Sequence, residues 1–155
     1  MCINRIRGRI LSVDPLGAAS LNGYRLEFNM QSLIDGSGKC SIRHTGDSGD
    51  FVHGVLYDFD PASLKKLDKY EGLGVCYNRL TISVEKGGEL FDAITYSGLD
   101  DAIVDGVLPY TWYLNYVIEG ARQNCLPPEY IAFLESVPSK DDTNHARDSQ
   151  NRHNA

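Results

Sequence analysis

The sequence predicts an α+β domain, a small mixed β-barrel with flanking helices. Runs in which apolar and polar residues alternate, as they do in strands, fill much of the chain up to Gly98. One helical pattern interrupts these runs and two more follow them, which is the arrangement of an α+β domain. The 155 residues favour a single domain, which we assign to residues 1–137. Because almost nothing is apolar from Pro138 onward, residues 138–155 are predicted to form a disordered polar tail.

Several runs have the alternation that is typical of strands. After the turn signal Asn22–Gly23, apolar Tyr24, Leu26 and Phe28 alternate with polar neighbours. Two later runs flank Gly87–Gly88, a pair that favours a hairpin turn. The predicted strands cover residues 24–29, 40–42, 51–59, 80–84 and 91–96.

The first predicted helix has clear signals at both ends. Asp60 can cap its start, and Pro61 suits the first helical position. Gly72 and Gly74 stop it, so the helix is expected to end at Glu71. Apolar periodicity predicts the remaining helices over residues 110–124 and 129–137.

The composition excludes several kinds of partner. The net charge of −6 argues against nucleic acid or an anionic membrane, because phosphate binding needs clustered Lys and Arg. The four cysteines include no CxxC pair and no HExxH motif occurs, so we expect no metal and no cofactor. No secretion signal or membrane-spanning run is recognisable, which favours a cytoplasmic protein with reduced thiols. Nothing in the sequence indicates an oligomeric state.

Physical chemistry singles out one carboxylate and three phenols. The negative end of the helix macrodipole lies beside Glu71 and disfavours its charged form, which suits a general base and acid. The alternative is an exposed Glu beside a helix-ending glycine. Tyr77, Tyr96 and Tyr113 come from three different elements, and their hydroxyls could line a polar cavity. The alternative is that they are core aromatics with hydroxyls at the surface.

Five segments, in order and at similar spacing, resemble those of the γ-glutamylcyclotransferase-like family. Leu67–Gly72 resembles the LDxYEG segment, which carries the family's catalytic Glu at the position of Glu71. The resemblance covers residues 20–135. The other similar segments are 21–29 (LxGYxLxFN), 52–57 (VxGVLY), 93–96 (AxTY) and 120–130 (GAxxxGLPxEY).

The resemblance implies a cyclotransferase that needs no metal or cofactor. Such an enzyme converts a small γ-glutamyl compound to 5-oxoproline and releases an amine or amino acid. Glu71 would act as its general base and acid, and Tyr77, Tyr96 and Tyr113 match residues that line the substrate pocket. The leaving group would contact the loop over residues 98–108. The competing hypothesis is an inactive paralogue that binds a small ligand or a protein.

The N-terminus departs from the family pattern. The family opens with a strand that ends in a Tyr-Gly-Ser-Asn-Met loop, which holds the γ-glutamyl group. Here the chain begins Met1-Cys2-Ile3-Asn4-Arg5, and Met1 aligns with the Met of that loop. We therefore expect the first strand and the substrate loop to be absent. A misassigned start codon and a genuinely shortened, inactive paralogue both explain this, and the upstream DNA would distinguish them.

Overall fold

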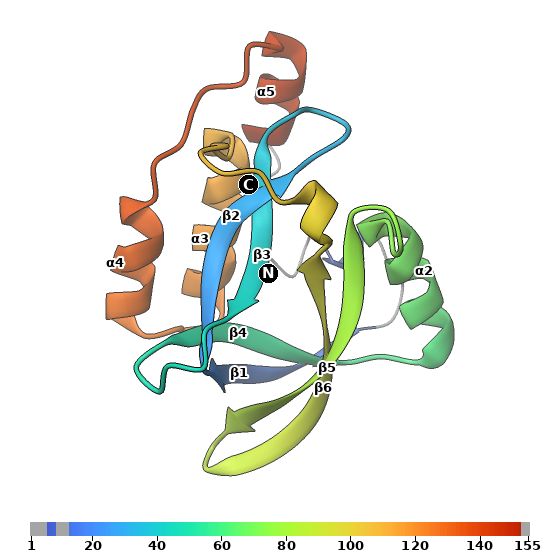
Figure 1. The fold of residues 1–155 in the computed structure, drawn as a ribbon, viewed down its shortest axis with the longest axis vertical. Coiled ribbons are helices and arrows are strands. Elements are labelled where there is room, and N and C mark those ends of the chain that lie inside the picture. The colour runs from blue at the N-terminus through green and yellow to red at the C-terminus, as the bar shows by residue number, and fades with distance from the viewer. Residues whose placement is uncertain (1–5, 9–12, 153–155) are drawn as a thin grey trace.

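The computed structural model describes residues 6–8 and 13–152, and Figure 1 shows their arrangement. The prediction for the first strand and substrate loop falls on Met1–Arg5, which lie outside the described residues. Helices α3 and α4 lie beside β2 and β3, whereas α2 lies on the other side of the sheets (Figure 1). The elements are β1 (Asp14–Asn22), β2 (Tyr24–Gln31), β3 (Gly38–His44), β4 (Phe51–Asp58), α2 (Pro61–Glu71), β5 (Tyr77–Lys86), β6 (Glu89–Gly98), η1 (Asp100–Ala102), α3 (Thr111–Gln123), α4 (Pro128–Ser136) and α5 (His145–Arg152).

The strands form a four-stranded sheet in the order β4-β1-β5-β6 and a two-stranded sheet of β2 and β3. Each pair of neighbours is antiparallel. The two sheets meet where the Gly98 N–H donates to Ser41 Oγ at 3.0 Å and Ser97 Oγ donates to the Ile42 carbonyl at 3.2 Å. The predicted α+β class with flanking helices is therefore confirmed, and the sheets curve around a shared interior.

Strand β1 was not predicted. Its first half, Asp14-Pro15-Leu16-Gly17, contains a register shift against β4 between Pro15 and Gly17, and Gly17 has φ 114°. The following Ala18, Ala19 and Ser20 are small and have little β propensity. The strand exists because β4 and β5 supply its hydrogen-bond partners, which no local pattern reveals.

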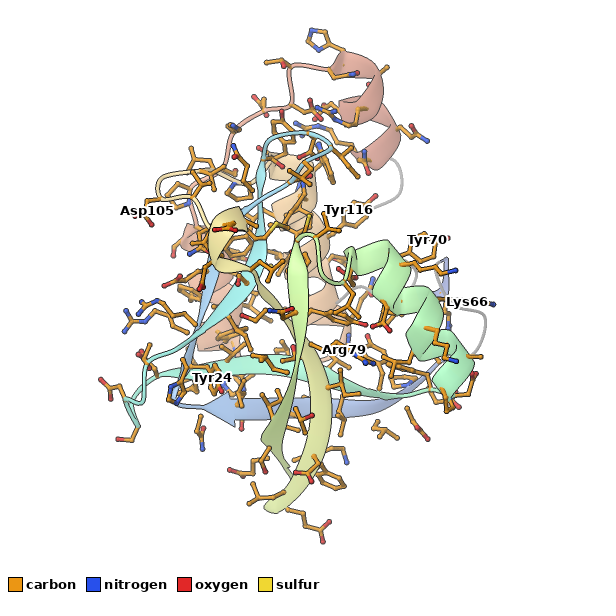
Figure 2. All side chains as sticks on the ribbon, turned by 45° about the vertical axis from the view of Figure 1, so that its right-hand side comes forward. Tyr24, Lys66, Tyr70, Arg79, Asp105 and Tyr116 are labelled. Carbon is orange, nitrogen blue, oxygen red and sulfur yellow. The ribbon has the colours of Figure 1, made fainter. Side chains whose placement is uncertain are left out.

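Helix α2 begins and ends where the sequence predicts. The Asp60 side chain accepts hydrogen bonds from the backbone N–H groups of Ala62 and Ser63, at 2.7 and 2.8 Å. Gly72 ends the helix in the left-handed conformation, with φ 69°. Figure 2 shows α2 beside the β5–β6 hairpin, with Lys66 on the solvent side. These caps fix the position of Glu71, the last residue of the helix.

The main apolar core lies between β2 and the helices α3 and α4. It comprises the buried residues Phe28, Leu114, Ile118, Ala121, Leu126, Tyr130 and Leu134. A smaller cluster beneath α2 contains Leu67 and the partly buried Tyr96. The two clusters hold α3 and α2 on opposite sides of the sheets, so that their residues can face a common interior.

The prediction of a disordered tail from Pro138 is wrong for the described residues up to Arg152. Backbone hydrogen bonds join Lys140 to Pro109 and Thr111, at 3.0 and 2.9 Å, and α5 follows. Electrostatic contacts hold this C-terminal segment (residues 138–152) in place, because it buries a charged side chain and not apolar surface. Asp142 is buried and accepts a hydrogen bond from Trp112 Nε1 at 3.0 Å, while Arg147 pairs with the same carboxylate.

Across residues 6–8 and 13–152, no helix has the length and apolar character needed to cross a membrane. The same residues include no group of three or more His, Cys, Asp or Glu side chains arranged to hold a metal ion.

Candidate active site

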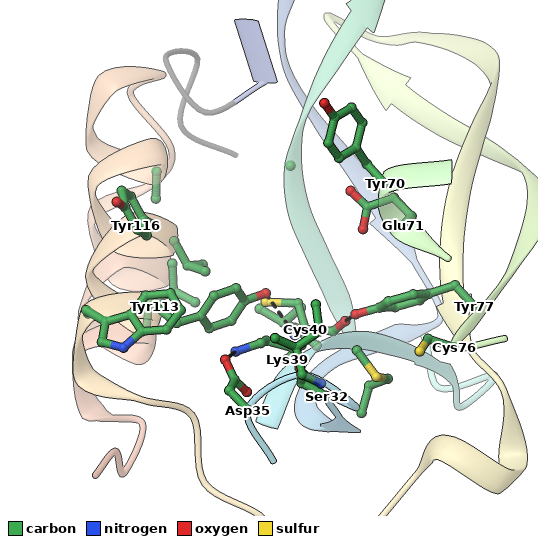
Figure 3. A pocket seen from close by; sticks show the side chains of 18 of the residues that line it. Ser32, Asp35, Lys39, Cys40, Tyr70, Glu71, Cys76, Tyr77, Tyr113 and Tyr116 are labelled. Carbon is green, nitrogen blue, oxygen red and sulfur yellow. Dashed lines mark hydrogen bonds and ion pairs between the residues drawn. The ribbon is translucent and has the colours of Figure 1, made fainter. Parts of the chain in front are cut away.

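A cavity of about 520 Å³ lies between β2, β3, the end of α2 and α3. Its lining includes Glu71 from α2, Tyr77 from β5 and Tyr113 from α3, so the structure brings three of the four predicted site residues together. Figure 3 shows Glu71 above Tyr77, with Tyr113 reaching in from the opposite wall. No residue of the fully described loop 98–108 lines this cavity, so its predicted contact with the leaving group is not supported.

Glu71 is placed by a tight connection between α2 and β5. The N–H of Leu73 donates to the Asp68 carbonyl at 2.9 Å, and the N–H of Cys76 donates to the Gly72 carbonyl at 2.9 Å. These bonds turn the chain sharply, so that Glu71 and Tyr77 lie on the same side of the turn, toward the cavity (Figure 3). Glu71 is half-buried. Its carboxylate therefore lies at a cavity wall that a ligand can reach.

Tyr77 and Tyr113 both bind the main chain of Cys40. The Cys40 N–H donates to the Tyr113 hydroxyl at 3.1 Å, and the Tyr77 hydroxyl donates to the Cys40 carbonyl at 3.0 Å. Cys40 faces a bulge in β2, where the register shifts between Glu27 and Met30. The two phenols therefore supply partners that the β2–β3 ladder does not, and they join three elements at the cavity floor (Figure 3).

The phenol of Tyr113 stays protonated at neutral pH. Burial raises the pKa of Tyr113 well above its ordinary value. This phenol can therefore donate or accept a hydrogen bond and hold the wall in place, but it cannot act as a phenolate base at neutral pH.

Tyr96 does not join this cavity. It lines a second cavity, of about 560 Å³, between α2 and the four-stranded sheet. Its hydroxyl donates to Asp68 Oδ1 at 2.8 Å. Burial raises the pKa of Tyr96, and the hydrogen bond and charge of Asp68 raise it further. This geometry ties β6 to α2. Tyr96 and Glu71 line different cavities, although the charge of Glu71 also raises the pKa of Tyr96.

A buried ion pair that the sequence did not single out lines the cavity. Lys39 Nζ lies 2.9 Å from Asp35 Oδ2, with side chains only 13% and 6% exposed. Burial alone would raise the pKa of Asp35, but the Ser37 N–H and the Lys39 ammonium together hold that pKa below its usual range. The ammonium also lies 4.9 Å from the ring centre of Trp112. Nothing local in the sequence of residues 35–39 indicates that this pair is buried.

Arg147 on α5 also lines the cavity. Sequence reasoning missed it because it lies in the segment predicted to be disordered. Cys40 and Cys76 line the cavity as well.

The comparisons with known proteins agree with this architecture. The profile of the AIG2-like family matches residues 51–134, which include Glu71 and Tyr77. The chain is 30% identical to the γ-glutamylcyclotransferase of Bos taurus over 142 residues, covering 88% of this chain and 73% of the relative.

Two solved structures have the same fold. A γ-glutamyl cyclotransferase superposes with a TM-score of 0.80 at 25% identity, over 90% of this chain and 83% of the other. An uncharacterised protein from Homo sapiens gives a TM-score of 0.80 at 26% identity, with the same two coverages. The fold and the cavity thus define a protein of the γ-glutamylcyclotransferase type. The chain belongs to the AIG2-like family.

Proposed function

We propose that this chain cyclises a γ-glutamyl compound to 5-oxoproline and releases an amine or amino acid, with Glu71 as general base and acid. The observation that supports this is the position of Glu71 at the wall of the 520 Å³ cavity, beside Tyr77 and opposite Tyr113. Membership of the AIG2-like family and the identity to a γ-glutamylcyclotransferase support the same reaction.

The reaction needs one proton carrier. Glu71 takes a proton from the α-ammonium of the glutamyl group, and the freed amine attacks the γ-carbonyl carbon. A C–N bond forms within the glutamyl unit and closes a five-membered lactam. Glu71 gives its proton to the leaving nitrogen as the bond to that nitrogen breaks. Glu71 then carries the second proton from the new lactam nitrogen to the released amine, which departs as an ammonium group. Atoms and charges balance without a further reactant, and the base ends in the state in which it began.

The fold contributes to the reaction mainly by orienting the substrate. Nucleophile and electrophile belong to one molecule, so the enzyme gains rate by holding the chain of the glutamyl group in its folded, reactive shape. The wall formed by Tyr77, Tyr113 and the Cys40 main chain is fixed by hydrogen bonds across three elements. A rigid wall of this kind restricts the bound substrate to few conformations.

The test replaces Glu71 with Gln, which keeps the size of the side chain and removes its basicity. We expect kcat for 5-oxoproline release to fall about 10²- to 10⁴-fold, the usual contribution of a general base. Glu89→Gln is the matched control, because Glu89 is exposed at the β5–β6 turn. Circular dichroism and urea unfolding check that both variants fold. Wild-type rates in Glu71→Gln would exclude Glu71 as the base.

A ligand-binding role without turnover is the second candidate. It is favoured by the hydrogen bonds that direct the hydroxyls of Tyr77 and Tyr113 to the main chain of Cys40. A wild-type chain that binds γ-glutamyl compounds but forms no 5-oxoproline from any of them would support this role against the enzyme.

A further inference from the structure

Tyr130 on α4 carries a buried hydroxyl group without a hydrogen-bond partner. Three buried side-chain oxygens lack such a partner within residues 6–8 and 13–152, and they belong to Asn29, Tyr130 and Asp148. Asn29 and Asp148 line neither cavity, whereas Tyr130 is 6% exposed and lines the cavity that Glu71 also lines. A buried hydroxyl without a partner costs free energy, because it has lost its hydrogen bonds to water. A ligand in the cavity can supply the missing partner.

The hydroxyl of Tyr130 differs in this respect from those of Tyr77 and Tyr113, which bind the main chain of Cys40. Burial raises the pKa of Tyr130, and an electrostatic interaction with Cys40 raises it further, which places the hydroxyl in the same region. The backbone N–H of His53 opposes this rise in pKa. A backbone N–H can only donate, so the proton of the Tyr130 hydroxyl still has no acceptor among the described residues. Tyr130 is therefore a hydrogen-bond donor at neutral pH.

The ring of Tyr130 is held in place by packing. Tyr130 belongs to the main apolar core. Its ring centre lies 5.0 Å from that of His53, in an edge-on contact, and 5.7 Å from that of Phe133. A ring packed in this way cannot turn its hydroxyl toward bulk water. The donor is therefore fixed before a ligand binds, which is what electrostatic stabilisation of a transition state requires.

The wall of the cavity around Tyr130 favours an uncharged ligand atom. Ala121, Leu126 and Leu134 line the cavity and belong to the same buried cluster as Tyr130. A carboxylate beside these side chains would lose its hydration at a high cost, whereas an amide oxygen that accepts a hydrogen bond loses much less. The glutamyl unit of a γ-glutamyl compound has a single uncharged oxygen, which is that of the γ-carbonyl.

We propose that Tyr130 donates a hydrogen bond to the γ-carbonyl oxygen of the bound substrate, as a further catalytic residue for ring closure. This inference rests on the proposed function. When the α-amine attacks, an electron pair of the carbonyl bond moves to this oxygen, which becomes negatively charged. The pair returns to carbon as the bond to the leaving nitrogen breaks, and the phenol keeps its proton throughout. Tyr130 thus stabilises charge on oxygen, while Glu71 carries protons between the nitrogens.

Tyr130→Phe removes the hydroxyl and keeps the ring. With γ-glutamyl-alanine as substrate, we expect kcat for release of 5-oxoproline to fall about 10²-fold, the effect of losing one donor to an oxyanion. KM should rise only about 3- to 10-fold, because the hydrogen bond strengthens as charge develops. The free energy of unfolding in urea should stay the same or rise, because an unsatisfied hydroxyl leaves the core. A purely structural hydroxyl gives the opposite pattern, with lower stability and wild-type kcat, and that result would overturn the proposal.

Binding distinguishes a failure of this inference from a failure of the proposed function. N-ethylglutaramic acid has the γ-carbonyl but no α-amine, so it cannot cyclise, and octanoic acid has the same chain length without the amide. In titration calorimetry, Tyr130→Phe should bind N-ethylglutaramic acid about 3- to 10-fold more weakly than the wild type does, and octanoic acid equally well. This selective loss in a protein that forms no 5-oxoproline would remove the cyclotransferase function and keep the hydrogen bond.

Two binding results would reject the hydrogen bond from Tyr130. Unchanged affinity for both compounds would show that water, and not the ligand, satisfies the hydroxyl. An equal loss for both compounds would show a general change in the shape of the cavity. Tyr24→Phe is the matched control, because Tyr24 lines neither cavity, and this variant should keep the kcat, KM and affinities of the wild type.

Discussion

Replacing Asp142 with Ala should detach the C-terminal segment from α3 while the two sheets stay folded. The Asp142 carboxylate has no exposed side-chain surface and accepts four hydrogen bonds. Two come from Arg147, one from Trp112 and one from the N–H of Asn144. Alanine removes every one of these and leaves the indole N–H and the guanidinium without their acceptor.

The size of the effect follows from what else holds the segment. Breaking a buried ion pair costs about 3–5 kcal/mol. The value for Asp142 should lie near the lower end, ~3 kcal/mol, because Arg147 keeps contact with water. Helix α5 has no buried side chain, and its 8 residues are too few to form a stable helix alone. Other bonds to the segment include those between the main chains of Lys140, Pro109 and Thr111 and the bond from Tyr116 to the Asn151 carbonyl. These bonds join neutral groups and are weaker than the ion pair.

Hydrogen exchange and fluorescence measure this release. Backbone amides of His145–Arg152 should lose their protection, and the emission of Trp112 should shift to the red as water reaches the indole. Asp141→Ala is a close control, since Asp141 is the adjacent residue but its side chain is 85% exposed. It should change stability by less than about 0.5 kcal/mol. Unchanged protection of α5 in Asp142→Ala would refute the view that one buried carboxylate holds the segment.

Three further predictions follow from the same structure. Hydrogen bonds from Arg147 hold the pKa of Asp142 below its usual range, so Asp142 takes up a proton more readily when the C-terminal segment is detached. Docking of the segment should therefore be complete above about pH 4 and weaken below it. The fluorescence of Trp112 measures this change. Loosening as the pH rises from 4 to 7 would contradict this sign. Gly38→Ala should cost more than about 3 kcal/mol in urea unfolding, because its Cβ would clash with the backbone oxygen of Phe28 in β2. Gly36→Ala, which meets nothing within 4 Å, should cost only about 1 kcal/mol from its φ of 68°. Tyr96→Phe should lower stability by about 1 kcal/mol but leave substrate KM unchanged, and a KM effect larger than the stability effect would place Tyr96 in the site.

The sequence predicted helix α2 well because the signals that limit it are local. Asp60 caps the helix through its own neighbours within three residues, and Gly72 ends it through its own backbone conformation. The position of Glu71 followed from those two signals. Its presence at a cavity wall did not, because that depends on how α3 and β3 pack opposite α2.

The elements that the sequence missed depend on distant partners. Strand β1 is stabilised by pairing with β4 and β5, and its own residues are small. Composition led to a prediction of disorder after Pro138, since a chain with little apolar surface is not expected to fold. That reasoning does not account for a buried ion pair such as that of Asp142 and Arg147. The pair holds the polar segment in place because Asp142 also accepts a hydrogen bond from the indole of Trp112, 30 residues away in the chain.

Tyr96 shows what strand periodicity can predict and what it cannot. In the β5–β6 ladder Tyr96 lies opposite Arg79, two residues from Tyr77, so both tyrosines project from the same face of the hairpin. They are nonetheless one pleat repeat apart along the strands, about 7 Å. Helix α2 crosses that face, and its Asp68 binds Tyr96 while Glu71, three residues later, lines the other cavity. The end of a single helix thus separates a structural contact from the candidate chemistry. The alternation of a strand predicts on which face of the sheet a side chain lies. Which cavity that side chain lines depends on how helix α2 packs on that face.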